Sequence, residues 1–415
     1  MYMASSHTTC SFLSFFLLFL FLVIVPPQVL VGARSLNGRG RRSGGVTGDG
    51  LCELVVIPQG YKCQEYKVQT EDGYILGLQR IPQGRESKGD GKKRQPVLLQ
   101  HGILVDGSSW VLNPPEESLA FILADNGFDV WIANTRGTTW SPTHISLNIT
   151  DQAFWSFSWD ELVSYDLPAN LDFVYQQTGQ KVDYVGHSLG TLIALSSLSQ
   201  GKLVDKMKSA ALLSPIAYLS HITTPLGNLV ARAFVAEVTK WLGISEFNLK
   251  SKIVSDFINK LCDQPGVDCF DLVAAITGNN CCLNHTAVEY YLKYEPQPTS
   301  TKNFIHLAQM VRDGVITKYN YGSKEANMKH YGQVNPPPYN MSNIPKDFPL
   351  FLSYGGRDAL SDTDDVLQLL DDLKMHDVDK LRVQYVEEYA HVDFVLGVNA
   401  KAIVYGPIIS FFNTH

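Results

Sequence analysis

The stretch that organises this chain of 415 residues is VDYVGHSLGTLIALSSL, residues 182–198. It opens at 182–185 with a short, largely apolar run, which is typical of a buried strand. Residues 191–198 are mostly apolar and suit a helix that packs on this strand. A helix that follows a strand so closely needs a sharp turn, and Gly186 and Gly190 supply the small residues that such a turn requires.

Three further apolar runs have the same form, at 97–99, 130–133 and 349–352, and each leads into a glycine within a few residues. Short apolar runs of this kind, separated by helical stretches, are typical of buried parallel strands. The expected helices between them are 117–126, 159–178 and 363–374. The alternation predicts an α/β protein with a mostly parallel, doubly wound sheet, whose active site lies at the carboxyl ends of the strands.

Ser188 is the candidate nucleophile, because it is the central residue of the G-x-S-x-G pattern at 186–190. The expected strand-to-helix turn exposes such a hydroxyl above the sheet, near the positive end of the following helix. The alternative interpretation is an ordinary serine at the start of a helix. The strand before it and the helix after it favour the nucleophile.

A nucleophilic serine needs a base and a carboxylate, expected later in the chain in the order Ser, Asp, His. Asp358 follows the strand-like run 349–352 and two glycines, so we predict that it is the acid. Asp362 and Asp364 are its competitors, but both stand where a helix begins and are better explained as capping residues.

Three histidines follow Asp358, and they are His376, His391 and His415. His391 lies in a loop after the strand-like segment 382–386, whereas His376 ends a helix and His415 ends the chain. We therefore predict His391 as the base, with a loop histidine of purely structural role as the alternative.

The oxyanion of an ester transition state needs two backbone N–H donors. Leu189 directly follows the candidate nucleophile and is expected to provide one. Ile103 is expected to provide the other, because Gly102 before it allows the backbone to approach the substrate. His101 is interpreted as a hydrogen-bonding residue of this loop.

The alternation of strand-like and helical stretches stops between residues 217 and 343, where the sequence is helix-like and contains four cysteines. We expect an inserted cap over the sheet. Leu226, Val230, Phe234, Val238 and Trp241 recur there at helical spacing. Two interpretations stay open: a helix face packed on the core, or a lid surface that meets lipid.

The N-terminus resembles a targeting segment. An apolar run at 12–25 is shorter than the roughly 20 residues of a membrane span, and Val31-Gly32-Ala33 follows as a candidate cleavage site. We predict a signal peptide at 1–33, with an uncleaved anchor as the alternative, and a flexible Gly/Arg/Ser-rich segment at 34–50.

Passage through an oxidising compartment predicts disulfides and glycans. Cys52 and Cys63 are expected to pair, and the other four mature cysteines to link within their own segment. The disulfide candidates are Cys52, Cys63, Cys262, Cys269, Cys281 and Cys282. Three Asn-x-Ser/Thr sequons lie at Asn148, Asn284 and Asn340. We expect a secreted protein, or one in the lumen of a secretory or lytic compartment.

The composition indicates a globular protein and gives no sign of a nucleic acid partner. Hydrophobic residues make up 45% and charged residues 18%, which is typical of a globular protein and argues against disorder. The net charge of -7 gives no reason to expect a nucleic acid partner.

Several motifs together resemble the acid lipase family, which includes gastric and lysosomal lipases and plant triacylglycerol lipase-like proteins. They are QHG at 100–102, NTRGT at 134–138, SWDE at 158–161, YDLPA at 165–169, GHSLG at 186–190 and HVDF at 391–394. The resemblance covers about residues 50–415. It implies the α/β-hydrolase fold with a helical cap, a triad of Ser188, Asp358 and His391, and hydrolysis of triacylglycerols or sterol esters without a cofactor. NCCLN at 280–284 resembles plant members more than animal ones.

These expectations divide the chain into a signal peptide, a flexible segment, a hydrolase core at 51–216 and 344–415, and a cap at 217–343. The expected function is hydrolysis of lipid esters at a lipid–water interface through an acyl-enzyme. Two alternatives remain: a non-lipase esterase or acyltransferase, and a non-catalytic binding protein of the same fold. The second alternative is disfavoured because members without activity usually lack a triad residue.

Overall fold

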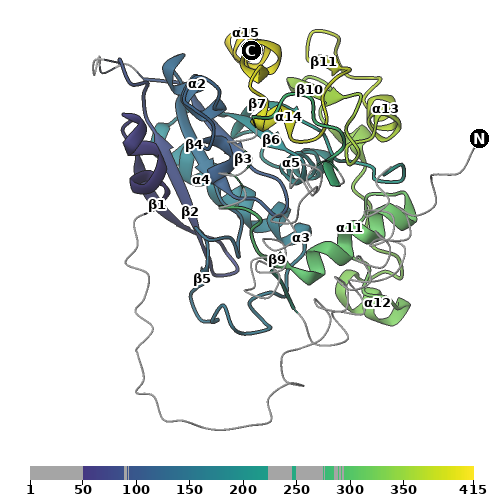
Figure 1. Cartoon of the computed structure of the whole chain (residues 1–415). Helices are drawn as coiled ribbons and strands as arrows, with labels where there is room; N and C mark the ends of the chain where they lie inside the picture. The colour runs from purple at the N-terminus through teal and green to yellow at the C-terminus, as the bar shows by residue number, and fades with distance from the viewer. Residues whose placement is uncertain are drawn as a thin grey trace, which may run out of the picture.

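The structure is a computed structural model that describes residues 50–87, 91, 93–222, 245–248, 274, 276–284, 288, 291 and 294–415. Its centre is a nine-stranded sheet with the order β1-β2-β4-β3-β6-β7-β10-β11, in which β5 pairs with β2 (Figure 1). The strands are β1 Gln64–Gln69, β2 Tyr74–Ile81, β3 Pro96–Gln100, β4 Asp129–Ala133, β5 Thr143–His144, β6 Val182–His187, β7 Met207–Leu213, β10 Leu350–Gly355 and β11 Leu381–Val386.

Six neighbouring strands, from β4 to β11 along the sheet, are parallel to one another. This confirms the predicted parallel sheet, and four of its strands are buried along their whole length, as the apolar runs indicated: β3, β4, β6 and β10. Strand β7 completes the central sheet and was not predicted from the sequence. The antiparallel edge formed by β1 and β2 was also not predicted.

Alternate side chains of the buried strands enter two separate cores, because successive strand residues point to opposite faces. Leu98 and Tyr184 belong to one core, and Val97 and Val185 belong to the other. The faces are covered by different helices, which is the layered arrangement of a doubly wound sheet.

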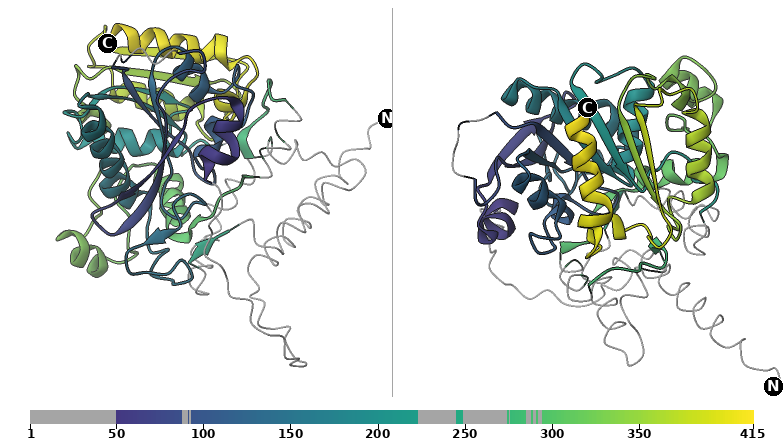
Figure 2. Two further views of the ribbon diagram at one scale, coloured as in Figure 1. Left: turned by 90° about the vertical axis from the view of Figure 1, so that its left-hand side faces the viewer. Right: turned by 90° about the horizontal axis from the view of Figure 1, so that it is seen from above.

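One face of the sheet is covered by side chains of α3 Trp159–Glu161, α4 Leu167–Thr178, α5 Leu189–Ser199 and α13 Thr363–Asp372. The other face is covered by α2 Leu119–Asp125, α14 Asp393–Leu396 and α15 Gly406–Thr414 (Figure 2). The short helices are η2 Cys52–Val56, η3 Ile57–Gln59, η4 Gly107–Trp110, η5 Leu162–Asp166, η6 Met341–Asn343 and η7 Lys401–Tyr405. The predicted helix at 159–178 consists of three consecutive segments, α3, η5 and α4, of which η5 is π-helical.

The described part of residues 217–343 contains a separate two-stranded sheet, β8 Glu246–Phe247 with β9 Thr299–Ser300. It also contains α11 Thr301–Asp313 and α12 Lys324–Tyr331, which lie together at one side of the molecule (Figure 1). The apolar stripe from Leu226 to Trp241 lies outside the described residues.

The SWDE motif at 158–161 contacts this part of the chain. The Asp160 carboxylate accepts hydrogen bonds from the Tyr319 N–H at 2.8 Å and from the Tyr339 hydroxyl at 2.7 Å. The Trp159 indole stacks on the His306 ring, with the ring centres 4.1 Å apart. The motif therefore has a structural role that its composition alone did not reveal.

Two disulfides occur among the described cysteines. Cys52 is bonded to Cys63, and Cys281 is bonded to its neighbour Cys282. Cys262 and Cys269 lie outside the described residues. None of the helices in the described ranges has the length and apolar character needed to cross a membrane.

Candidate active site

Ser188 occupies the turn between β6 and α5, with an unusual backbone φ of 54°. A side chain at positive φ is strained and is retained where the surrounding structure enforces it. Close backbone contacts explain both flanking glycines: Gly186 faces the turn itself, and Gly190 faces the end of β3. A Cβ on Gly186 would lie 2.8 Å from backbone atoms of Gly190, and a Cβ on Gly190 would lie 2.5 Å from the Gln100 carbonyl oxygen. This is the strand–turn–helix context that distinguishes a nucleophile turn from a chance pattern.

The loop after β3 lies directly against Ser188. A Cβ on Gly102 would come within 2.9 Å of the Ser188 Cβ and 3.4 Å of its Oγ, so only a glycine leaves room there. Neither the N–H of Leu189 nor that of Ile103 is hydrogen-bonded to another residue in the described part of the chain. Two backbone donors thus remain available on elements that flank the serine.

His101 fixes the conformation of the same loop. Its Nδ1 donates to the Gly102 carbonyl oxygen at 2.8 Å, and its Nε2 accepts the Thr135 N–H at 3.1 Å. Burial lowers the pKa of His101 to about 4, partly opposed by the bond to Gly102. The ring is therefore neutral near pH 7 and serves as a structural link between two loops.

Asp358 follows β10 in a turn that contains Gly355 and Gly356. A Cβ on Gly355 would lie 2.1 Å from the Tyr389 carbonyl oxygen, so this glycine allows the loop after β11 to contact the turn. The Asp358 Oδ1 accepts the N–H groups of Leu360 and Ser361 at 2.9 and 2.8 Å.

The Asp358 carboxylate is buried next to His391. Its two oxygens each lie 3.0 Å from Nδ1 of the His391 ring. Burial alone would raise the pKa of Asp358, but His391 and the N–H groups of Ser361 and Leu360 outweigh burial and hold the pKa below its ordinary value. The carboxylate is thus ionised near neutral pH and orients the imidazole.

The turn that carries His391 is tied to the turn that carries Ser188. His187 Nε2 donates to the His391 carbonyl oxygen at 2.9 Å, and the Ser214 hydroxyl donates to the same oxygen at 3.3 Å. The rings of His187 and His391 lie with their centres 4.9 Å apart. Burial, with a further contribution from His391, lowers the pKa of His187 to about 3, so this neighbour stays neutral.

The competing candidates for the acid and the base do not contact the His391–Asp358 pair. Asp362 caps α13, where its carboxylate accepts the Asp364 N–H at 2.9 Å. His376 Nε2 is bonded to the Phe348 carbonyl oxygen, and His415 contacts Asp379 and the end of α15. Among the three later histidines, only His391 contacts Asp358.

Two residues that support His391 were not identified from sequence. The Thr277 carbonyl oxygen accepts the His391 N–H at 3.1 Å, and the buried Asp393 carboxylate accepts the Ala390 N–H at 2.7 Å. Asp393 had a signal in the HVDF motif. Thr277 had none, because it acts through a backbone carbonyl that every residue type possesses.

Comparison with known proteins shows which family the chain belongs to. A family profile described as a partial alpha/beta-hydrolase lipase region matches residues 53–114, and one described as the alpha/beta hydrolase fold matches residues 95–247. The chain is 58% identical to triacylglycerol lipase 2 of Arabidopsis thaliana over 88% of its own length and 87% of that protein. It is 38% identical to gastric triacylglycerol lipase of Rattus norvegicus, over 85% and 88% of the two chains. The chain belongs to the acid lipase family.

Solved structures show the fold of this acid lipase homologue independently. A soluble variant of monoglyceride lipase from Saccharomyces cerevisiae matches with a TM-score of 0.52 at 18% identity, over 86% of this chain and 98% of that one. A carboxyl esterase from Bacillus coagulans matches with a TM-score of 0.54 at 15% identity, over 85% and 98%. The predicted α/β-hydrolase fold is therefore confirmed.

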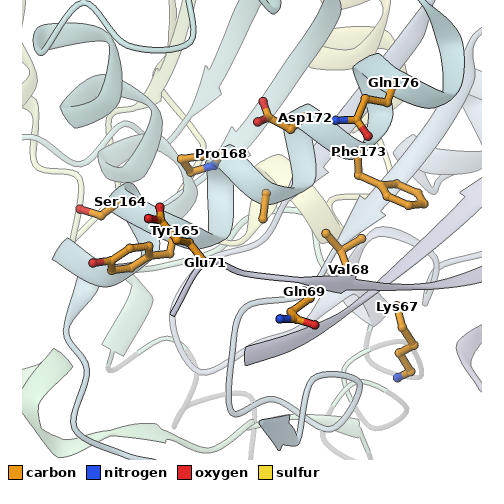
Figure 3. Close-up of a pocket in the computed structure, with 11 residues that line it drawn as sticks. Lys67, Val68, Gln69, Glu71, Ser164, Tyr165, Pro168, Asp172, Phe173 and Gln176 are labelled. Atoms are coloured by element: carbon orange, nitrogen blue, oxygen red, sulfur yellow. The ribbon is translucent and has the colours of Figure 1, made fainter. Parts of the chain in front are cut away.

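A separate pocket of about 340 Å³ lies between β1 and α4 (Figure 3). Lys67, Glu71 and Asp172 contribute its charged groups, and Ser188, Asp358 and His391 do not line it. Asp172 is paired with Lys206, and Lys67 donates to the Trp140 carbonyl oxygen. This pocket of the acid lipase homologue is thus distinct from the candidate active site.

The three sequon asparagines, Asn148, Asn284 and Asn340, are all exposed. An acceptor for a glycan must be accessible, so the position of each is compatible with modification.

Proposed function

We propose that this protein is a secreted lipase that hydrolyses acyl esters of lipids, triacylglycerols or sterol esters, through Ser188, His391 and Asp358. The observation that carries the proposal is the hydrogen-bonded, buried pair of His391 and Asp358, together with a strained turn at Ser188. All three residues follow the carboxyl ends of strands of the main sheet. Membership of a family with named triacylglycerol lipases supports the same chemistry.

In the proposed reaction, Ser188 Oγ attacks the ester carbonyl carbon while His391 Nε2 accepts the hydroxyl proton. The N–H groups of Leu189 and Ile103 stabilise the oxyanion. His391 then returns the proton to the departing alcohol, which leaves an acyl group on Ser188. A water molecule, deprotonated by His391, attacks the carbonyl carbon of this acyl-enzyme. His391 then returns the proton to Ser188 Oγ as the ester bond to the serine breaks and the fatty acid leaves.

Asp358 and the neutral neighbour His187 favour the role of His391 as the general base. The ionised carboxylate at Nδ1 holds the imidazole in the tautomer whose Nε2 accepts a proton, and it stabilises the imidazolium that forms. His187, with a pKa of about 3, adds no positive charge beside that imidazolium. The depressed pKa of Asp358 keeps this carboxylate ionised near neutral pH.

We further infer that residues 217–343 form a cap on a hydrolase core made of 51–216 and 344–415. Support comes from the main sheet, which passes from β7 directly to β10, whereas the described strands in between, β8 and β9, pair only with each other. The signal peptide at 1–33 and the segment 34–50 complete this proposal, although 1–49 lie outside the described residues. Exposed sequons at Asn148, Asn284 and Asn340 are compatible with passage through the secretory pathway.

The test is a hydrolysis panel with purified protein: a soluble short-chain ester, emulsified triacylglycerols and cholesteryl esters, each at acid and neutral pH. A lipase with a cap over an apolar site should hydrolyse the emulsions and accelerate as a short-chain triacylglycerol passes its solubility limit, because an apolar surface offsets the exposure of the inner cap. Hydrolysis of the soluble ester alone would favour a plain esterase. Inertness toward every ester and toward a serine-reactive phosphonate would favour a binding protein.

A further inference from the structure

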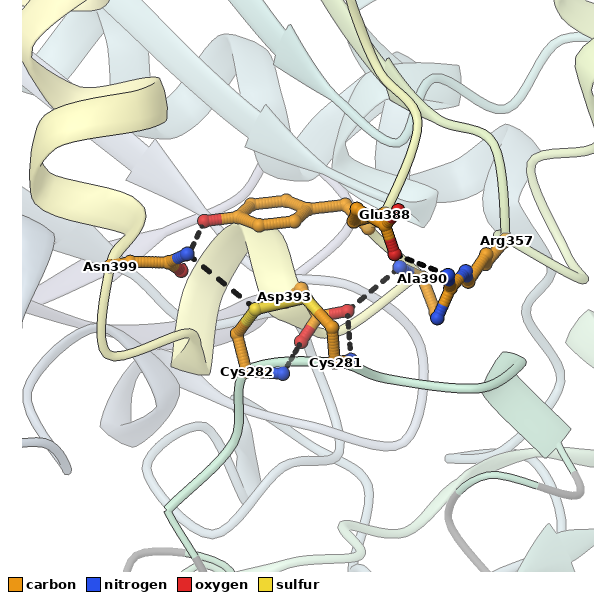
Figure 4. The surroundings of a disulfide bond; sticks show 8 residues. Cys281, Cys282, Arg357, Glu388, Ala390, Asp393 and Asn399 are labelled. Atoms are coloured by element: carbon orange, nitrogen blue, oxygen red, sulfur yellow. Dashed lines mark hydrogen bonds and ion pairs between the residues drawn. A yellow bond between two sulfur atoms is a disulfide. The ribbon is translucent and has the colours of Figure 1, made fainter.

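The carboxylate of Asp393 gathers hydrogen bonds from two distant parts of the chain. Asp393 begins α14, two residues beyond His391, and is buried. It accepts the Ala390 N–H at 2.7 Å within its own loop, and the N–H groups of Cys281 and Cys282 at 3.1 Å each from the insertion (Figure 4). The residue before His391 is therefore linked through one carboxylate to two consecutive cysteines.

These two cysteines are bonded to each other. A disulfide between adjacent residues closes a small ring through the peptide bond that joins them, so the backbone of Cys281 and Cys282 is restricted. The ring keeps two consecutive N–H groups directed at the two oxygens of Asp393. The Val398 N–H also donates to the Cys282 carbonyl oxygen at 2.9 Å, and the Asn399 side chain donates to Cys282 Sγ at 3.5 Å.

The same segment of the insertion holds His391 directly. The Thr277 carbonyl oxygen accepts both the His391 N–H, at 3.1 Å, and the Ala359 N–H, at 3.4 Å. Gly278 packs so closely on the turn of Asp358 that a Cβ there would lie 2.0 Å from the Arg357 carbonyl oxygen. Residues 277–282 are thus built into the support of both members of the His391–Asp358 couple.

We propose that Asp393 and the Cys281–Cys282 disulfide position His391, and that reduction of this disulfide by a dithiol lowers turnover. The proposal rests on the proposed role of His391 as the base. Asp393 does not contact the reacting atoms, so it is a positioning residue. Reduction frees the Cys281–Cys282 peptide from its ring, and the two N–H groups no longer share one fixed direction toward Asp393.

The Cys281–Cys282 disulfide is reduced by thiol–disulfide exchange. A thiolate of the dithiol attacks one cysteine sulfur, which breaks the Cys281–Cys282 bond and releases the other cysteine as a thiolate. The second sulfur of the dithiol then attacks the dithiol sulfur of this mixed disulfide and releases the first cysteine, so that two cysteine thiols and a cyclic disulfide result. Two electrons pass from the dithiol to the cystine. Cys281 is exposed and Cys282 is half-buried, so a reductant has access to the bond, whereas Cys52 of the other described disulfide is buried. Accessible disulfides are the ones that small thiols reduce first.

The central experiment reduces the full-length protein with graded dithiothreitol, alkylates the freed thiols, maps them by mass spectrometry and measures kcat and KM on a soluble ester. Turnover should fall on the order of tenfold, the factor expected for weakening a hydrogen bond to a charged group. The fall should follow alkylation of Cys281 and Cys282, KM should change little, and reoxidation should restore activity. Unchanged turnover with both thiols alkylated would overturn the proposal.

Variants separate this disulfide from any other. A protein with Cys281→Ser and Cys282→Ser should have the low turnover of the reduced wild type and show no further response to dithiothreitol. Asp393→Asn should lower kcat by roughly tenfold to a hundredfold, because an amide cannot accept three N–H groups. Glu388→Gln is the matched control, since this exposed partner of Arg357 lies in the same loop (Figure 4) and should keep wild-type kcat. Full turnover in the serine double variant would contradict the proposal.

Hydrogen exchange gives a readout that does not depend on hydrolysis. Reduction should accelerate exchange in peptides that contain 277–283 and 388–396, where the N–H groups of Cys281, Cys282, Ala390 and His391 are bonded. Faster exchange in a protein without esterase activity would show that the link exists while the proposed function fails. Esterase activity with no change in exchange or turnover on reduction would leave the proposed function intact and refute the role of the disulfide.

Discussion

The backbone N–H of His391 donates to the carbonyl oxygen of Thr277 at 3.1 Å, which joins the predicted base to the inserted segment. The proposed cap at 217–343 therefore contributes a hydrogen bond to the candidate site itself. A substitution in the segment that carries Thr277 is therefore expected to alter the orientation of the His391 imidazole.

Ser188→Ala should abolish nearly all hydrolysis, by on the order of 10⁴-fold in kcat, because no other group replaces the nucleophile. The fold should persist, since the substitution removes only a hydroxyl from a turn that backbone bonds maintain. Initial rates on a soluble ester and far-UV circular dichroism check both statements. Ser146→Ala, at an exposed serine, is the control. A Ser188→Ala protein that keeps a sizeable part of wild-type turnover would refute the nucleophile.

Asp358→Asn should lower kcat by roughly 10³- to 10⁴-fold, because an amide facing Nδ1 favours the wrong imidazole tautomer. Asp362→Asn should have little effect, since asparagine caps a helix about as well as aspartate and Asp362 caps α13. Steady-state kinetics of the two purified variants make the comparison. Equal losses, or the reverse order, would show that the wrong carboxylate has been assigned.

Gly102→Ala should lower kcat by about a hundredfold, the size of effect expected when a reacting group shifts by about an ångström. The added Cβ would lie 2.9 Å from the Ser188 Cβ and would push the loop with Ile103 away from the nucleophile. Gly406→Ala is a suitable control, because its Cβ would meet its nearest atom at 3.5 Å. A Gly102→Ala enzyme with wild-type kcat would argue against this loop as part of the oxyanion site.

Acidification should destabilise the protein partly through His101. Its pKa is about 4 in the folded chain against 6.5 for an ordinary histidine, so between these values the unfolded chain binds a proton that the folded chain rejects. This contribution is fully present above pH 6.5 and is lost as the pH falls toward 4. From pH 7 to pH 5 the wild type should lose about 2 kcal/mol more unfolding free energy than His101→Asn. Urea unfolding at both values tests this, and parallel losses in the two proteins would exclude the effect.

Glycosidase treatment of protein made in a secretory host should reduce its mass, because Asn148, Asn284 and Asn340 are exposed. Replacing each asparagine with glutamine in turn should remove one glycan from the mass spectrum. Absence of any glycan on secreted protein would refute the sequon assignments, and retention of the untreated protein in the cytosol would refute the signal peptide.

The sequence predicted the parallel core well, because fully buried strands must be apolar along their whole length. Strands β3, β4, β6 and β10 met this condition. Strand β1 escaped identification because it is an edge strand with a largely polar, exposed sequence. Strand β7 is largely buried, but its sequence MKSAALL consists mostly of residues that favour helices, so its composition did not indicate a strand.

Sequence by itself also determined which residues compete for the candidate site. The spacing of Gly186, Ser188 and Gly190 specifies a strained turn, and the chain order of the later acids and histidines left few choices. These features are local, so neighbouring residues suffice to specify them. The pairing of His391 with Asp358 followed from their positions after consecutive parallel strands.

Only the tertiary structure decided how these residues are supported. The bonds from His187 to the His391 carbonyl, from Thr277 to the His391 N–H, and from Asp393 to Cys281 and Cys282 join segments far apart in the chain. Most of them use backbone atoms, which every residue type provides, and so leave no signature in composition or spacing. The positions of the strands and of the insertion, rather than the identity of single residues, bring those atoms within hydrogen-bonding distance.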